Sequence, residues 1–212
     1  SKNYKVYGIS LPNKNSFHIY NKANVNKISK SFYENIINFN SLEDIFKKIK
    51  PDYVIHLAAQ PLVIESYKKP FETFRTNIRG TLNVLELANK YSSGKVINFT
   101  SDKVYQNVKK KSLKESDYLK GHDPYSLSKS CSDLIGQCLN ENYNKKINRL
   151  KITTLRCGNL IGGGDWSENR ILSDYFKSYL KKEPLIIRNP NSVRPWQHVI
   201  NSVDVINQVI KN

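Results

Sequence analysis

The chain has 212 residues, enough for one globular domain with a sizeable core. Its formal net charge is +16, but the lysines are scattered and form no long basic arm, which favours a solvated surface over a nucleic-acid site. The spacing of Cys131, Cys138 and Cys157 suits neither zinc nor a Cys-x-x-Cys pair, and no apolar run approaches the ~20 residues that span a bilayer, so a cytoplasmic protein without a membrane segment is expected.

Segments rich in β-branched and aromatic residues alternate with segments of helical period, which is typical of βα units around a parallel sheet. Strands are predicted at residues 4–10, 35–38, 53–58, 95–100 and 152–157, and helices at 41–49, 73–90 and 124–140. Buried parallel strands read as apolar runs, as residues 53–59 do. The predicted fold class is therefore α/β, with a doubly wound Rossmann-type parallel sheet.

The sequence changes character after Cys157. Glycines occupy positions 162–164, and a helix at 170–182, a strand at 185–188 and a closing helix from Val203 are predicted beyond them. This pattern indicates a small substrate-binding region, so we expect a division into 1–157 and 158–212, each incomplete at its outer end.

The start of the chain departs from a complete dinucleotide-binding sheet, which begins with a strand, a Gly-rich turn and a helix N-terminus. Here the chain enters a strand near Tyr4 with no such turn before it, and position 1 is not methionine. We therefore expect that the first strand and its loop are missing. Because that strand is central in the 3-2-1-4-5-6 order, its loss predicts a gap between the strands that end near Ser10 and Ala58.

Tyr125 and Lys129 stand four residues apart at the start of a predicted helix, on one face. A neighbouring ammonium lowers the pKa of a phenol and favours a base near neutral pH. The spacing alone is weak evidence, because the chain has 13 tyrosines. Ser101, Asp102 and Lys103, however, follow the strand 95–100 at the edge where open α/β sheets bind ligands. A capping turn would explain Ser101 and Asp102, but the two motifs together predict an acid/base cluster.

Several strings of the sequence resemble the CDP-glucose 4,6-dehydratases, within the NAD-dependent epimerases and dehydratases of the extended short-chain dehydrogenase/reductase family. These strings lie at residues 56–63, 76–81, 100–103, 123–129, 158–166 and 187–198. The last two are the most specific, because related dTDP-glucose dehydratases typically lack Gly-Gly-Gly-Asp-Trp and carry Thr-Asp-Glu in place of Ser-Asp-Lys.

The resemblance implies a lyase that converts CDP-glucose to CDP-4-keto-6-deoxyglucose through transient hydride transfer to bound NAD, in deoxysugar and O-antigen-type lipopolysaccharide synthesis. It implies that Tyr125 takes the proton of the C4 hydroxyl and that Lys129 assists and holds the cofactor's ribose. Ser101 would bind that hydroxyl, and Asp102 would protonate the departing C6 hydroxyl. Lys103 would serve as the C5 base only with a strongly lowered pKa.

The resemblance also assigns binding residues. Ala58, Ala59 and Gln60 would line the nicotinamide ribose, and Asn77 would support the strand ends. The nucleotide sugar would be faced by Asn159, Arg170, Arg188, Arg194 and His198. Arginine is the expected partner of a pyrophosphate, although a surface charge explains Arg170 or Arg188 equally well. The helices at 73–90 and 124–140 would pair two copies of the chain as a homodimer.

Three alternatives stay open at this point. The chain could be a dehydratase or epimerase for another nucleotide sugar. It could be a non-catalytic fragment that binds only a sugar nucleotide or a partner subunit, because the phosphate-binding loop is missing. Its basic surface could bind nucleic acid, with an affinity that falls steeply as salt rises.

Overall fold

The structure, a computed structural model, describes residues 4–12, 19–92, 94–106, 112–143 and 150–212. The strands in these ranges form three separate parallel sheets. They are β1 (Tyr7–Ser10) with β2 (Lys30–Tyr33); β3 (Tyr53–His56), β4 (Lys95–Phe99) and β5 (Lys151–Leu155); and β6 (Asn159–Ile161) with β7 (Trp196–His198).

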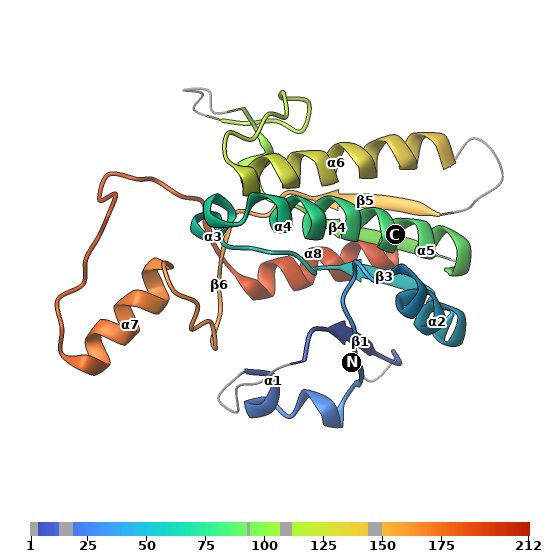
Figure 1. Cartoon of the computed structure of the whole chain (residues 1–212), viewed down its shortest axis with the longest axis horizontal. Coiled ribbons are helices and arrows are strands. Elements are labelled where there is room, and N and C mark those ends of the chain that lie inside the picture. The colour runs from blue at the N-terminus through green and yellow to red at the C-terminus, as the bar shows by residue number, and fades with distance from the viewer. Residues whose placement is uncertain (1–3, 13–18, 93, 107–111, 144–149) are drawn as a thin grey trace.

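Helices connect the strands (Figure 1). They are α1 (Ile19–Lys22), α2 (Phe39–Ile49), α3 (Val63–Lys68), α4 (Pro70–Phe74), α5 (Gly80–Tyr91), α6 (Pro124–Tyr143), α7 (Ile171–Lys181) and α8 (Val199–Lys211). Short turns of other helical types lie at Val25–Lys27, Arg75–Arg79 and Asp102–Val104. Among the described helices, none is long and apolar enough to cross a membrane.

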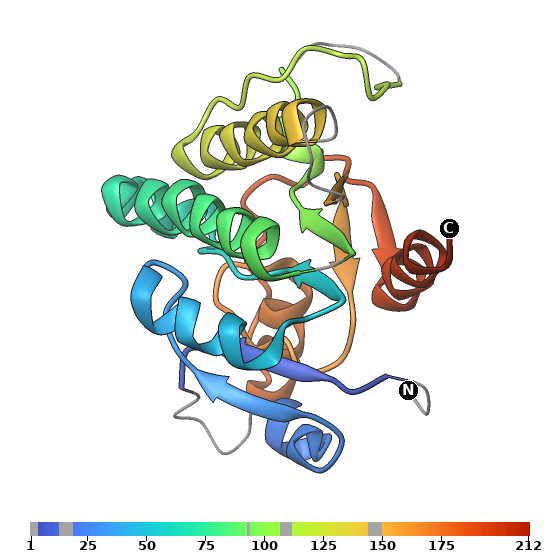
Figure 2. The same cartoon turned by 90° about the vertical axis from the view of Figure 1, so that its right-hand side faces the viewer.

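The β3–β4–β5 sheet carries helices on both faces, with α2, α5 and α6 on one side and α8 on the other (Figure 2). Leu42 and Phe46, one turn apart on α2, pack with Leu85 and Leu87 of α5 against Val96 of the sheet. On the opposite side, the Lys95 amine donates to the Val209 carbonyl of α8 at 3.0 Å. Helices on both faces of a parallel sheet confirm the predicted doubly wound α/β class.

A gap separates the two N-terminal sheets, as the sequence predicted. β1 pairs with β2 and β3 pairs with β4, and no described strand joins β1 to β3. The two sheets nevertheless touch, because Ile9 packs against the core cluster and the rings of Tyr4 and Tyr53 meet edge to face at 6.4 Å. The described strands thus leave β1 and β3 unpaired with each other, which agrees with the predicted break between them.

The strand predicted at residues 35–38 is wrong, and β2 lies earlier. Local side-chain hydrogen bonds hold this segment in a turn: the Asn35 amide donates to Glu34 Oε1 at 2.7 Å, and the Ile37 amide to Asn35 Oδ1 at 3.1 Å. Such bonds satisfy the backbone without a partner strand. Residues 30–33 pair with β1 instead, with Lys30 opposite Tyr7.

Other expected boundaries also change. The helix predicted at 73–90 is interrupted by the π-helical turn at Arg75–Arg79, and the closing helix begins at Val199 rather than Val203. The strand predicted at 185–188 does not form, whereas β6 and β7 pair without having been predicted. A strand needs a neighbour for its backbone groups, and 185–188 has none among the described strands.

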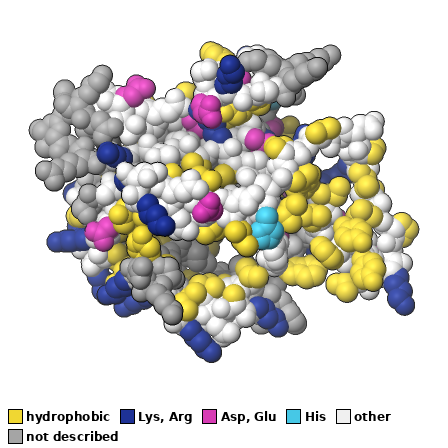
Figure 3. All heavy atoms as spheres, turned by 180° about the vertical axis from the view of Figure 1, so that it is seen from behind, with side chains coloured by type: hydrophobic (Ala, Val, Ile, Leu, Met, Phe, Trp, Pro, Cys, Tyr) yellow, Lys and Arg dark blue, Asp and Glu magenta, His cyan; other side chains and the backbone are white. Residues whose placement is uncertain are grey.

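Helix α7 lies at one side of the molecule and exposes an apolar surface. Tyr175, Phe176, Tyr179 and Leu180 are all exposed. Figure 3 shows apolar spheres gathered on its right, the side of the molecule on which α7 lies. On the same face the lysines and arginines are scattered rather than gathered in a stripe. The division into 1–157 and 158–212 stays a prediction.

Candidate active site

A cavity of about 1440 Å³ opens at the carboxyl ends of β3 and β4, bounded on its far side by α7 and the extended segment that follows it. This is the edge where open α/β sheets bind ligands. The cavity brings together most of the predicted site residues: Ala59, Ser101, Asp102, Lys103, Tyr125, Lys129, Asn159, Arg170, Arg188 and Arg194. The predicted residues Ala58, Gln60, Asn77 and His198 lie outside its lining.

Ser101 and Asp102 form a tight turn directly after β4. The Ser101 hydroxyl oxygen accepts a hydrogen bond from the Lys103 amide at 3.2 Å and donates to Asp102 Oδ1 at 3.0 Å. The Asp102 amide donates to the Cys157 carbonyl at 3.0 Å, which ties the turn to the segment that follows β5. Ser101 therefore caps a turn and also lines the cavity, so a capping role and membership of the predicted acid/base cluster are compatible.

Tyr125 and Lys129 lie on the face of α6 that points to this turn, and both are buried. Pro124 starts the helix, at a position where its fixed φ and missing N–H suit helix geometry. The Lys129 amine donates to the Phe99 carbonyl at 2.9 Å. Burial lowers the pKa of Lys129 to about 8, because a charged amine is poorly solvated there.

Burial raises the pKa of Tyr125, while the Ser101 hydroxyl and the Arg170 guanidinium act in the opposite direction. The net direction is opposite to the expectation that the pKa of this phenol is lowered. Desolvation of the phenolate outweighs the nearby positive charge. The Ser101 hydroxyl and the Arg170 guanidinium therefore offset only part of the rise that burial causes in the pKa of Tyr125.

Asn77 does not line the cavity; it connects the loop that follows β3 to α6. Its side chain is 1% exposed; Oδ1 accepts from the Gln60 amide at 2.8 Å, and Nδ2 donates to the Gln60 carbonyl at 3.1 Å and to Ser128 Oγ at 2.8 Å. Gln60 Nε2 turns inward to Thr73 Oγ1 at 2.8 Å. These bonds hold the loop after β3 against α6, and they place Ala59 beside the cavity.

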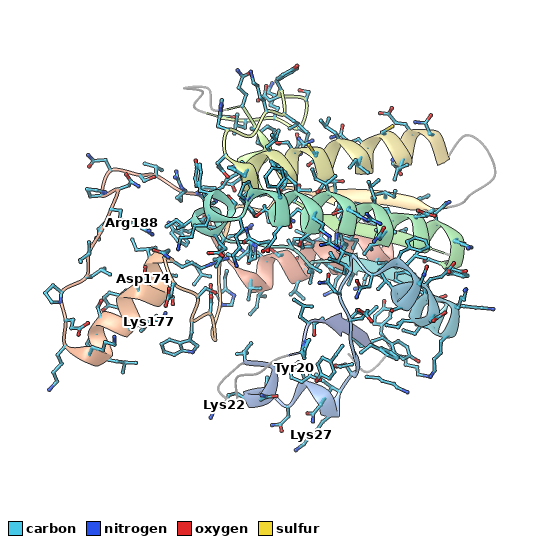
Figure 4. The ribbon with its side chains drawn as sticks, viewed as in Figure 1. Tyr20, Lys22, Lys27, Asp174, Lys177 and Arg188 are labelled. Atoms are coloured by element: carbon cyan, nitrogen blue, oxygen red, sulfur yellow. The ribbon has the colours of Figure 1, made fainter. Side chains whose placement is uncertain are left out.

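The cationic residues of the C-terminal region differ in their surroundings. Arg170 precedes α7; its Nε lies 3.5 Å from Asp165 Oδ2 and is buried without a hydrogen bond to any described residue. Arg188 donates to Asn169 Oδ1 at 2.7 Å and to the Asn169 carbonyl at 3.1 Å, which fastens the extended segment to the turn before α7. Figure 4 shows Arg188 beside α7, where Asp174 and Lys177 are labelled.

The last two predicted substrate residues make local contacts. Arg194 is exposed and donates to the carbonyl of its neighbour Val193 at 2.9 Å. His198 Nδ1 accepts from the Ile200 amide at 3.2 Å and so caps the start of α8. Each of these bonds uses one nitrogen of its side chain, so Arg194 has further N–H donors and His198 has Nε2 for other partners.

Sequence reasoning missed Asp133 and Arg156, which support the site from behind. The Asp133 carboxylate accepts from Thr100 Oγ1 at 2.9 Å, next to Ser101, and from Arg156 Nε at 2.8 Å. One signal was present, since Asp133 follows Lys129 by four residues and continues the face that carries Tyr125. Arg156 offered no such signal, because it lies in a different βα unit.

The fold and the paired motifs at its ligand-binding edge define an extended short-chain dehydrogenase/reductase. A model of the GDP-mannose 4,6 dehydratase family matches residues 1–212, and the chain belongs to this family. The membership confirms the family resemblance that the sequence motifs carried.

Relatives of known name agree with this membership. The chain is 37% identical to the CDP-glucose 4,6-dehydratase of Salmonella typhimurium over 92% of its own length and 56% of that protein. Its fold is similar to that of the dTDP-glucose 4,6-dehydratase of Streptomyces venezuelae (TM-score 0.83, 23% identity, 98% of this chain and 63% of that one). It is also similar to the UDP-glucose 4-epimerase of Thermotoga maritima (TM-score 0.83, 26% identity, 96% and 64%). The chain thus spans less than two thirds of these relatives.

Proposed function

We propose that this chain carries the active site of a nucleotide-sugar 4,6-dehydratase that acts on CDP-glucose. The observation that carries the proposal is that Ser101, Asp102, Tyr125 and Lys129 line one cavity at the carboxyl edge of the sheet. The cavity volume of about 1440 Å³ exceeds the roughly 300–1,000 Å³ typical of a site for one small molecule, so it has room for a sugar nucleotide and a cofactor.

The residues present fit the nicotinamide half of NAD. Ala59 lines the cavity with a small side chain that would let the flat nicotinamide ring approach closely. Lys129 donates one N–H to the Phe99 carbonyl, and its other N–H groups can donate to ribose hydroxyls. NAD, when bound, supplies the acceptor that takes a hydride from the sugar and later returns it. The residues of the chain bind and orient the cofactor and the sugar, and they transfer protons.

The proton steps follow from the turn and the helix. Tyr125 must first ionise, which the nearby Lys129 ammonium would favour, and its phenolate then accepts the proton of the sugar's C4 hydroxyl while the Ser101 hydroxyl holds that oxygen in place. Asp102, which accepts from Ser101 at 3.0 Å, acts in its protonated form and gives that proton to the C6 hydroxyl as it leaves as water, while the proton taken from C5 balances the elimination. Lys103 lines the same wall, and a Lys103→Met variant that still oxidises C4 but loses no water would assign the C5 proton to its amine.

The start of α7 is the proposed contact for the diphosphate. Arg170 Nε and Ser173 Oγ are both buried there without a hydrogen bond to the described residues. The N–H groups of the first helical turn and a guanidinium favour an anion at this position. Arg188 and Arg194 line the cavity beyond it.

The direct test is incubation of the purified chain with NAD and either CDP-glucose, dTDP-glucose or UDP-glucose, followed by mass spectrometry. We expect loss of one water from CDP-glucose and a rate reduced by roughly 10²- to 10⁴-fold in Tyr125→Phe, which removes the proton acceptor. Loss of water from another sugar nucleotide alone would change the substrate, and epimerisation without loss of water would overturn the dehydratase assignment.

We further propose a cytoplasmic homodimer that serves deoxysugar and O-antigen-type lipopolysaccharide synthesis. The outer faces of the helices support the pairing, since Phe71 of α4, Leu82 of α5, and Leu127 and Leu134 of α6 are exposed. The similarity to a named CDP-glucose 4,6-dehydratase supports the metabolic setting.

A further inference from the structure

An ion pair between buried Asp133 and partly buried Arg156 lies behind the acid/base cluster. Asp133 of α6 is 0% exposed, and its carboxylate accepts from Arg156 Nε at 2.8 Å and from Arg156 Nη2 at 3.0 Å. The same carboxylate accepts from Thr100 Oγ1 at 2.9 Å and from Gln137 Nε2 at 2.6 Å. Each oxygen of Asp133 therefore has two donors, and the fork of Arg156 fixes the carboxylate's orientation.

Asp133 connects the helix of Tyr125 to the turn of Ser101. Residues 125, 129 and 133 follow one another at helical spacing on α6, so the carboxylate sits two turns beyond the phenol. Thr100, its partner, directly precedes Ser101, and the Thr100 amide donates to the Leu155 carbonyl of β5 at 2.9 Å. The hydrogen bond between Thr100 and Asp133 therefore helps to set the distance between Tyr125 and Ser101, although neither of these two residues takes part in it.

Arg156 also connects Asp133 to residues 112–121, which we call the covering segment. Arg156 Nη1 donates to the Tyr105 hydroxyl at 3.0 Å and to the Glu115 carbonyl at 2.8 Å, and the guanidinium lies 5.0 Å from the Tyr105 ring centroid. Tyr105 forms an antiparallel bridge with Leu119. Leu113 and Tyr105 line the cavity, whereas Asp133 and Arg156 lie outside its lining.

Stability alone is a weak reason for such a pair. Taking the Asp133 carboxylate and most of the Arg156 guanidinium out of water offsets much of their attraction, and well-packed apolar residues often stabilise a fold equally well. An apolar pair could not hold Thr100, Tyr105 and Glu115 in one geometry, because it offers no directional bonds. The arrangement is therefore better explained by positioning.

We propose that Asp133 and Arg156 are positioning residues that set the Ser101–Asp102 turn against Tyr125 and hold the covering segment over the substrate. The effect on turnover rests on the proposed function, but the effect on the turn and the covering segment does not. Arg156→Lys separates the two roles, since an amine can still meet Asp133 but cannot also reach Tyr105 and Glu115.

The test compares Asp133→Asn, Arg156→Met and Arg156→Lys with Glu43→Gln, a matched control that removes an ion pair between α2 and α5. Hydrogen exchange of the backbone amides is measured first, because it needs no activity. We expect exchange to speed up about tenfold or more at 101–105 and at 112–121 in Arg156→Met while α2 is unchanged, as local opening requires. Arg156→Lys should restore slow exchange at 101–105 only.

Turnover of the full chain is then measured with the substrate that the incubations identify. We expect kcat to fall about 100-fold in Asp133→Asn with KM changed less than about threefold, as for a misplaced catalytic group, and to recover partly in Arg156→Lys. Exchange that is unchanged, or that rises equally in α2 and at the turn, would overturn the proposal. A wild-type chain that turns over no sugar nucleotide but shows the local exchange pattern would refute the proposed function and leave the positioning role standing.

Discussion

At the scale of single residues, Lys129 links the site to the stability of the fold. Its pKa is about 8 in the folded chain, against 10.5 for a fully solvated lysine such as that of the unfolded chain, so the unfolded chain binds more protons between these values. The free energy of unfolding must therefore gain a rising contribution as pH increases from about 8.

Lys129→Met should lack that rise. We expect the wild-type free energy of unfolding, measured by urea denaturation between about pH 7.5 and 9.5, to climb relative to the variant. Lys48→Met, at an exposed position on α2, should keep the wild-type slope. Parallel slopes in wild type and Lys129→Met would show that the amine is not desolvated.

Asn77 should tolerate no change of its amide. In Asn77→Asp the buried side chain loses the donor that Gln60 and Ser128 require and gains an unpaired charge. We expect a loss of roughly 3 kcal/mol or more in the free energy of unfolding, which chemical denaturation would measure. Asn142→Asp, exposed near the end of α6, should stay within about 0.5 kcal/mol of wild type.

At the scale of elements, Glu43 joins α2 to α5. It accepts from the Lys90 amine and the Tyr91 hydroxyl, each at 2.7 Å, and lies 3.2 Å from the Lys47 amine. The hydrogen bonds from Lys90 and Tyr91 and the contact with Lys47 lower the pKa of Glu43 to about 2 from 4.5. A carboxyl with a depressed folded pKa stabilises the fold above its unfolded pKa and loses this effect as pH falls.

We therefore expect Glu43→Gln to lower the melting temperature at neutral pH and to remove part of the acid destabilisation between about pH 4.5 and 2. Asp44→Asn removes a more exposed partner of Lys47, at 3.9 Å, and should change little. Thermal unfolding across this pH range measures both. If the melting temperature falls equally with pH in wild type and Glu43→Gln over this acid range, the lowered pKa of Glu43 is contradicted.

The start of α6 depends on Gly121. A Cβ at this position would collide with the backbone of Ser126 and Leu127, which cannot move without shifting the turn that carries Tyr125. We expect Gly121→Ala to cost about 1–3 kcal/mol, the usual range for overpacking. Gly163→Ala meets nothing within 4 Å and should leave the unfolding midpoint unchanged; equal midpoints in both variants would refute the clash.

At the scale of the whole molecule, the exposed leucines of α6 should decide the oligomeric state. We expect wild-type chain to have the mass of a dimer by light scattering, and Leu127→Glu with Leu134→Glu to have the mass of a monomer, because buried charges oppose association. Ile28→Glu changes an equally apolar residue that is 73% exposed between α1 and β2, and it should leave the dimer intact. A monomeric wild type would remove the proposed pairing.

The positions of the proposed catalytic motifs were accessible from the sequence because they are local. The spacing of Tyr125 and Lys129 follows from helix geometry, and Ser101 and Asp102 follow a strand whose apolar run is visible in the sequence. The roles of Gln60 and Asn77 were not accessible. Their side chains turn inward to meet each other and α6, which no local pattern records.

The sequence by itself determined the alternation of strands and helices, the gap in strand order and the family, since these depend on periodicity, chain order and short motifs. Only the tertiary structure decided that residues 30–33 rather than 35–38 pair with β1, that 185–188 stays unpaired, and that burial raises the pKa of Tyr125. Strand pairing and desolvation depend on which distant residues lie alongside, and that information exists only once the chain is folded.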